Sequence, residues 1–227
     1  MKKILFKIFS ETLFYGNILL HPLFLPLYLM IWYMYLPSHT GFVYLELVPN
    51  ELKIKWIILY GLLVVIIPIL MLFFARIFRV VRTLFLDTIR DRRYFFLLLA
   101  VYNFSLFYMF RGMYWHPFFK PSIVLVGVMS ALLFAIILFT NNDFKISLHA
   151  AGMGAMTGFF MMLSMLYKVD LMTEVEFSIL LSGFVMLGRM LIKAHAFEEL
   201  LSGWALGLFV CVVIFATSYQ NIDWLNF

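Results

Sequence analysis

Three polar side chains near the C-terminal end of the chain have types and spacings suited to phosphate chemistry. Arg189 is followed by His195 and then by Glu199, four residues after the histidine, in a stretch that is otherwise mostly apolar. If a helix begins near His195, Glu199 lies on the same face, where its carboxylate could hold the imidazole in one tautomer and stabilise its cation. The Arg189 guanidinium could bind phosphate oxygens. This cluster predicts a nucleophilic histidine, an orienting carboxylate and an anion clamp.

A second cluster comprises Lys145, Ser147 and His149, which open a segment rich in small residues. Those small residues are Gly152, Gly154, Ala155 and Gly158. They would let the segment pack closely against a neighbouring helix and bring His149 towards His195. A second histidine is useful because a departing oxygen needs a proton source.

A third cluster is the basic run 90–93, which reads Arg90-Asp91-Arg92-Arg93. A phosphate with up to two negative charges needs several cationic donors, and this run supplies more of them. The same arginines could equally determine membrane topology, and only one of them, Arg92, is expected to touch a substrate.

The elements that position these clusters are predicted to be membrane helices. Of the 227 residues, 65% are hydrophobic and 13% charged, a composition that suits lipid better than water. The formal charge of +5 fits a topology signal or an anionic partner, and nothing in the chain indicates nucleic acid. The only cysteine, Cys211, cannot form an internal disulfide.

Seven segments are apolar enough to span the membrane if about 20 residues are required. They are 17–37, 56–77, 95–112, 121–140, 147–167, 174–192 and 198–218. His21-Pro22 and Pro26 predict a kink or a re-entrant start in the first, and the third is short, so the count could fall to six or five. No linker or repeat divides the chain, so residues 1–227 are expected to form one α-helical bundle.

The start of the chain is expected to be an amphipathic lead-in that the mature protein retains. Its apolar stretch is interrupted by Glu11, and no small-residue cleavage site follows. If all seven segments cross, one side of the membrane holds this start and the loops 78–94, 141–146 and 192–197. The three clusters then lie on the same side. Lys and Arg favour a cytoplasmic location for that side, but several of them are the phosphate-binding candidates themselves, so the sidedness stays open.

The three clusters resemble the signature motifs of the type 2 phosphatidic acid phosphatase (PAP2) superfamily, whose members are metal-independent lipid phosphatases in membranes. The resemblance covers about residues 87–207. The third family motif is Ser-Arg, five residues, His, three residues and Asp, which here becomes Gly188-Arg189, His195 and Glu199. The second, Pro-Ser-Gly-His, becomes Ile-Ser-Leu-His at 146–149. The first, a lysine followed later by Arg-Pro, survives only as the basic run, which no proline follows.

The chain also resembles a divergent bacterial branch of that family, largely unassigned phosphatase-like proteins. The branch has a His-Pro-Leu-x-x-Pro segment, an Asp-Arg-rich loop and a Lys-Ile-Ser-x-His motif, and the first and last of these stand here at 21–26 and 145–149. This likeness implies a fold, a PAP2-like bundle of about six or seven transmembrane helices. It restricts the range of possible substrates much less.

The resemblance implies a role for each matching residue. His195 would attack phosphorus to form a phosphohistidine, Glu199 would orient His195, and His149 would protonate the leaving alkoxide. The implied phosphate-binding residues are Arg189, Arg92, Arg90, Lys145 and Ser147, with Lys145 standing in for the missing lysine of the first motif. No metal and no cofactor are expected.

The departures from the family motifs leave three functions open. Glutamate replaces aspartate at 199, Leu148 replaces a glycine, and Gly188 replaces a serine, so the chain is either an enzyme or a catalytically silent protein that binds lipid phosphate or acts as a scaffold. A transporter is less favoured, because the polar residues gather at one surface and no inverted repeat is visible. His21 is expected to pack in the kink rather than to cap the site.

The expected activity is hydrolysis of a phosphomonoester or pyrophosphate on a lipid of the bacterial inner membrane. Phosphatidic acid, phosphatidylglycerol phosphate, polyprenyl pyrophosphates and lipid A phosphates all stay possible substrates, because headgroup selection depends on pocket shape. The expected partners are this substrate and the bilayer, and the oligomeric state is open.

Overall fold

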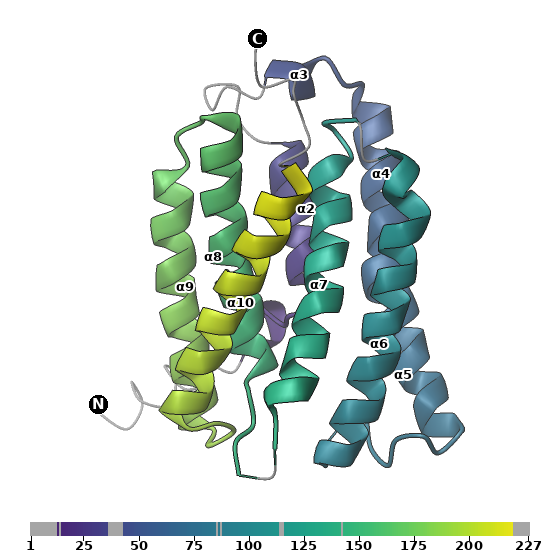
Figure 1. Ribbon diagram of the computed structural model, residues 1–227, viewed down its shortest axis with the longest axis vertical. Coiled ribbons are helices and arrows are strands. Elements are labelled where there is room, and N and C mark those ends of the chain that lie inside the picture. Colours follow the sequence, from purple (N-terminus) through teal and green to yellow (C-terminus); the bar gives the residue numbers. More distant parts are fainter. Residues whose placement is uncertain are drawn as a thin grey trace. The chain divides into compact units, whose positions relative to one another are not determined.

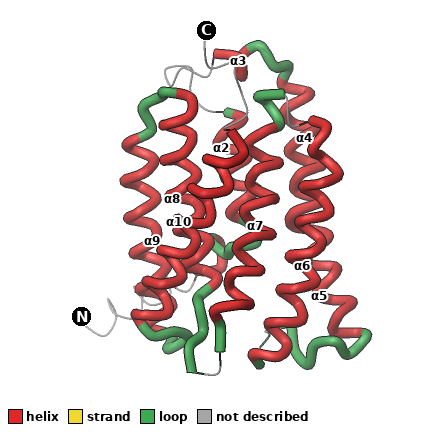
Figure 2. The backbone as a smooth tube through the Cα atoms, in the orientation of Figure 1, coloured by secondary structure: helices red, strands yellow, loops and turns green. Residues whose placement is uncertain are grey.

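Every regular element in the described part of the chain is a helix, as predicted (Figures 1 and 2). The computed structural model describes residues 13, 15–35, 43–84, 86, 88–113, 116–141 and 143–219. Most of the predicted lead-in lies outside these residues. The helices are α2 (Leu25–Met34), α3 (Val43–Glu46), α4 (Asn50–Gly61), η2 (Leu62–Ile66), α5 (Ile67–Ile77), α6 (Ile89–Phe110), η3 (Arg111–Met113), α7 (Lys120–Phe139), α8 (Leu148–Tyr167), α9 (Met172–Leu191) and α10 (Phe197–Tyr219).

Within the described residues, five helical stretches are long and apolar enough to cross a membrane, which indicates an integral membrane protein. They are Asn50–Ile77, Ile89–Met113, Lys120–Phe139, Leu148–Tyr167 and Phe197–Tyr219. Each overlaps one of the seven predicted segments. Helix α9 overlaps the sixth predicted segment, 174–192. It has 20 residues, which is long enough for a span, but it carries Glu174, Glu176 and Arg189. The total number of spans stays a prediction.

The first predicted span is broken at His21-Pro22, which confirms the predicted kink. Residues 15–19 are helical, 20–24 form a turn, and α2 begins at Leu25. Pro22 has no N–H to donate and disfavours a helical conformation at the residue before it. The Nδ1 atom of His21 instead accepts the N–H of Leu23 at 3.2 Å, which fixes the turn.

The chain divides into two compact units, which are described separately. One comprises Met1–Leu25 and Phe144–Ala216, and the other comprises Pro26–Asp143 and Thr217–Phe227. The second and third motif clusters belong to the first unit, and the basic run belongs to the second. The expectation of a single domain stays a prediction.

Glycines allow α8 and α10 to pack backbone against backbone in the first unit (Figure 1). A Cβ atom on Gly154 would collide with the carbonyl of Trp204, and one on Gly207 would collide with the carbonyl of Ala151. Small residues permit this close approach between membrane helices. The two helices run parallel, so their N-terminal ends, which carry the second and third motifs, lie together.

Buried hydroxyl groups join α9 to both of these helices. The Ser178 hydroxyl donates to Thr157 Oγ1 of α8 at 3.0 Å, and the indole N–H of Trp204 in α10 donates to Ser182 Oγ at 3.1 Å. Such bonds satisfy polar groups that would otherwise be costly in an apolar interior. They hold α9 against the α8 and α10 pair.

In the second unit, Asn50–Ile77 is one helical stretch with a π-helical segment, η2, just before Pro68. In a π-turn the carbonyl of Leu63 would accept from residue 68, but proline has no N–H. The hydroxyl of Tyr102 in α6 donates to that carbonyl at 2.9 Å instead. Tyr102 therefore satisfies the backbone group that the proline leaves open.

Candidate active site

A tight turn between α9 and α10 sets the spacing of the third motif. The N–H of Ala194 donates to the carbonyl of Arg189 at 3.0 Å, and the N–H of Lys193 donates to that of Met190 at 2.9 Å. Lys193 has a left-handed backbone with φ of 53°. This is the Schellman pattern, in which the chain leaves a helix through one left-handed residue. It ends α9 at Leu191, two residues after Arg189, and places His195 just before the start of α10.

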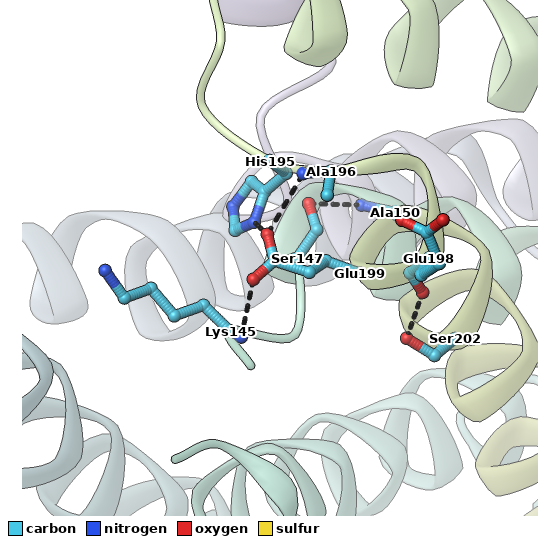
Figure 3. Close-up of polar contacts among 8 residues, drawn as sticks. All are labelled: Lys145, Ser147, Ala150, His195, Ala196, Glu198, Glu199 and Ser202. Atoms are coloured by element: carbon cyan, nitrogen blue, oxygen red, sulfur yellow. Dashed lines mark hydrogen bonds and ion pairs between the residues drawn. The ribbon is translucent and has the colours of Figure 1, made fainter. Parts of the chain in front are cut away.

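His195 and Glu199 are in contact, as their spacing predicts (Figure 3). The distance from His195 Nδ1 to Glu199 Oε2 is 2.9 Å, and the two side chains are 4% and 14% exposed. A carboxylate at this position favours the tautomer that carries hydrogen on Nδ1. The other ring nitrogen, Nε2, then presents a lone pair, which is what a nucleophilic histidine requires.

Glu199 also holds the local backbone together. Its Oε1 accepts the N–H of Lys145 at 2.7 Å, and its Oε2 accepts the N–H of Ala196 at 3.2 Å. The backbone N–H of Ser147 donates to the Glu199 carbonyl at 3.3 Å. The contact with Ala196 is one half of a capping box, because Glu199 is the third residue of α10. Glu199 therefore has a structural role beside any chemical one.

Lys145 and Ser147, both predicted to bind phosphate, differ in their surroundings. The Lys145 side chain extends away from the backbone on the same side as the His195 ring (Figure 3). Its ammonium has no hydrogen-bond or ion-pair partner within the described part of the chain. Ser147 is fully buried, and its hydroxyl caps α8 by accepting the N–H of Ala150 at 3.4 Å. The phosphate-binding roles of both residues stay predictions.

His149, the second residue of α8, has Arg189, His195, His21 and the backbone of Asn17 near its ring. Its ring donates a hydrogen bond to the backbone carbonyl of Asn17. Arg189 and His195 both lie close enough for their charges to act on it. The His21 ring lies against it edge to face, with the centroids 4.9 Å apart and the planes at 86°. The structure thus brings the two predicted histidines and the predicted arginine together.

His21 and Asn17 are the residues that sequence reasoning did not place here. His21 was expected to pack in the kink, and the structure sets it against His149 as well as in the turn. Asn17 could have been noticed in the sequence, because placing a polar residue in an apolar segment costs free energy and therefore suggests function.

The basic run lies at the start of α6 in the other unit, where its arginines have local partners. Arg92 Nε donates to the carbonyl of Leu86 at 2.9 Å. The guanidinium of Arg90 lies over the ring of Tyr94, 5.5 Å from its centroid. These contacts shape the loop and the first turn of α6. The predicted gathering of all three motifs at one site stays a prediction.

Among the described residues of the first unit, Arg189 and Lys145 are cations that lie near the histidines. Among the residues that the structure describes, no three His, Cys, Asp or Glu side chains gather in a way that could hold a metal ion.

Comparison of the chain with protein-family models, with curated proteins and with solved structures finds no match to any of them.

Proposed function

We propose that this chain is a metal-independent lipid phosphatase of the PAP2 kind, acting through a phosphohistidine. The observation that carries the proposal is the 2.9 Å contact between His195 Nδ1 and Glu199 Oε2, which leaves Nε2 as the nucleophilic atom. Arg189 and His149 lie near this pair, and in this proposal they act as the anion clamp and the proton donor. A nucleophile, its orienting group and a second acid are the parts that phosphoryl transfer through histidine needs.

In the first step, His195 Nε2 attacks phosphorus while the bond from phosphorus to the lipid oxygen breaks. The Glu199 carboxylate stabilises the positive charge that develops on the imidazole. Arg189 and Lys145 stabilise the negative charge on the non-bridging oxygens, a contribution that is largest where donors are already in place. His149 gives a proton to the leaving oxygen, so that the lipid departs as an alcohol or a phosphate.

In the second step, water attacks the phosphohistidine and the bond from nitrogen to phosphorus breaks. His149, now neutral, takes the proton from the attacking water, which is the reverse of its first role. Inorganic phosphate leaves, and His195 returns to its starting state. The negative charge of the bound phosphate helps His149 to hold its second proton close to Arg189.

The substrate would be a membrane lipid that carries a phosphomonoester or a pyrophosphate. Apolar helices around the site would keep the acyl or prenyl chains in the bilayer while the phosphate meets the histidines at its surface. We infer a location in the bacterial inner membrane and a bundle of six or seven spans, with α9 among them. Phosphatidic acid, phosphatidylglycerol phosphate, polyprenyl pyrophosphates and lipid A phosphates form the panel to test.

The deciding experiment measures phosphate release from this panel by the detergent-purified chain in the presence of EDTA. Release is expected for the wild type and for His116→Ala, a control histidine outside the three clusters. It should disappear in His195→Ala and in His149→Ala. Acid-labile, base-stable label from a ³²P-lipid should accumulate on wild-type protein and be absent from His195→Ala. Release that EDTA abolishes, or that survives His195→Ala, would contradict the proposal.

A second candidate function is binding of lipid phosphate without cleavage. The capping contacts of Glu199 favour it, because they account for the carboxylate without any chemistry. Folded protein that releases no phosphate from any member of the panel, yet binds a lipid phosphate in a manner that requires Arg189, would support this function over the first.

A further inference from the structure

The short N-terminal segment 15–25 holds His149 from outside its own helix. The backbone carbonyl of Asn17 accepts a hydrogen bond from the His149 ring. The ring of His21 packs against it at 4.9 Å, with the planes at 86°. A hydrogen bond at one point and a ring contact at another restrict both the position and the rotation of the imidazole.

His21 is itself fixed by the turn that contains it. Its Nδ1 accepts the N–H of Leu23 at 3.2 Å, and its carbonyl accepts the N–H of Phe24 at 2.8 Å. The His21 ring is therefore tied to the turn through Nδ1 as well as through its own backbone.

Two glycines leave room for segment 15–25 to pack beside His149. A Cβ atom on Gly188 would collide with the side-chain amide of Asn17. One on Gly152 would lie 3.1 Å from the Cβ atom of Pro22, closer than most real contacts. Gly188 stands where the PAP2 motif has serine, and Gly152 follows the second motif. Part of the departure from that motif thus makes room for the segment that holds His149.

We propose that His21 is a positioning residue for His149. Its ring, anchored in the turn at 20–24, keeps the imidazole of His149 in the orientation from which it protonates the leaving oxygen. The catalytic part of this inference rests on the proposed phosphatase function, whereas the restraint on His149 does not. Misplacement of a catalytic group by about 1 Å can cost about 10²-fold in rate, so the loss of this restraint should be measurable.

Two substitutions distinguish the contribution of the His21 ring from that of the turn that contains it. His21→Asn removes the ring, but its side-chain oxygen can accept the N–H two residues on, as in an Asx turn. His21→Phe keeps an aromatic ring beside His149 and removes the acceptor. Thermal unfolding is measured first, and His21→Ser, which makes the same turn more weakly, replaces His21→Asn if that variant does not fold.

The first readout does not require activity. Reaction of His149 with diethylpyrocarbonate, followed by peptide mass spectrometry on the full chain, reports how freely this imidazole is presented. The rate should rise in His21→Asn, because a side chain that loses its packing opens more often, and stay close to wild type in His21→Phe. Equal rates in wild type and both variants would overturn the inference whether or not the protein is a phosphatase.

The second readout depends on the leaving group. His21→Asn should lower kcat for a lipid phosphate by about 10–10²-fold, because an alkoxide leaving group needs the proton from His149. It should change turnover of p-nitrophenyl phosphate much less, since that leaving group departs without a proton. His21→Phe should retain wild-type rates with both substrates. Equal losses in both variants would refute positioning by the ring, because His21→Phe keeps an aromatic ring beside His149.

If the chain is not a phosphatase, the two readouts give a different combination of results. Wild-type protein would then release no phosphate from any substrate, while the modification rates of His149 would still separate His21→Asn from His21→Phe.

Discussion

Glu199 orients His195 and caps α10 at once, and two substitutions can separate these roles. Glu199→Gln keeps a side chain that serves in a capping box, whereas Glu199→Ala loses all the contacts of the carboxylate. Because the glutamine has no charge to stabilise the His195 cation, we expect kcat to fall by about 10²–10³-fold in both variants. Thermal unfolding should show a larger loss of stability in Glu199→Ala.

The control for this prediction is Glu198→Gln, because Glu198 is an exposed neighbour in the same turn of α10. It should leave kcat and the unfolding temperature close to wild type. A Glu199→Gln variant with wild-type kcat would show that the carboxylate is only a cap.

Gly188→Ser restores the serine of the family motif, and we expect it to lower activity rather than raise it. The new Cβ atom would collide with the Asn17 side chain, and overpacking of this kind typically costs about 1–3 kcal/mol. Asn17→Ala in the same chain removes the amide but keeps the backbone carbonyl that holds His149, so it should recover much of the loss. Thermal unfolding and kcat of the single and double variants check this, and a more active Gly188→Ser would contradict it.

The residues joined by local spacing could be predicted from the sequence. The contact between His195 and Glu199 follows from their separation by four residues at a helix start, and its distance of 2.9 Å fits that expectation. The contact between His21 and His149 could not be predicted, because the two residues are far apart in sequence and meet only through the tertiary fold. The role of the Asn17 carbonyl was hidden for the same reason, since any residue has a carbonyl.

Among the elements, the α8 and α10 pair determines whether the two motif histidines can meet. We expect Gly154→Ala and Gly207→Ala to lower stability by about 1–3 kcal/mol, because each Cβ atom would collide with a backbone carbonyl that cannot rotate away. Both should also lower kcat by separating the N-terminal ends of the helices. Unfolding by heat in detergent and phosphate release measure the two effects.

The matched control is Gly183→Ala in α9, where a Cβ atom would have no neighbour within 4 Å. This variant should be neutral or more stable by up to about 1 kcal/mol, since alanine favours helix over glycine. Equal effects at positions 154 and 183 would contradict close packing of α8 against α10.

Apolar length predicted where the long helices lie, but it placed the starts of two of them, Asn50–Ile77 and Ile89–Phe110, too late. The segment predicted at 95–112 is the helix Ile89–Phe110, because Thr88 caps it by accepting the N–H of Asp91 at 3.1 Å. Hydropathy overlooks such a polar first turn. The π-helical segment before Pro68 was not predicted either, because its contact with the hydroxyl of Tyr102 comes from another helix.

For the whole molecule, composition was enough to predict a membrane protein, but the number of spans depends on α9. Its 20 residues would extend about 30 Å, which matches the hydrocarbon core. Its charged residues, Glu174, Glu176 and Arg189, all lie near its two ends and leave an apolar stretch between them. Charged side chains at the ends of a span can reach the interface.

We therefore expect α9 to cross the membrane, which single cysteines at its two ends can test. Thr173→Cys and Ala194→Cys replace exposed residues on either side of the apolar stretch, and the native Cys211 is fully buried, so it should contribute little background. An impermeant thiol reagent added to intact spheroplasts should label one variant, and the other should react only after the membrane is opened. Labelling of both from the same side would mean that α9 does not cross, and α8 and α10, which run parallel, could not then both be simple spans. The variant that reacts in intact spheroplasts also fixes the sidedness of the site, because position 194 directly precedes His195.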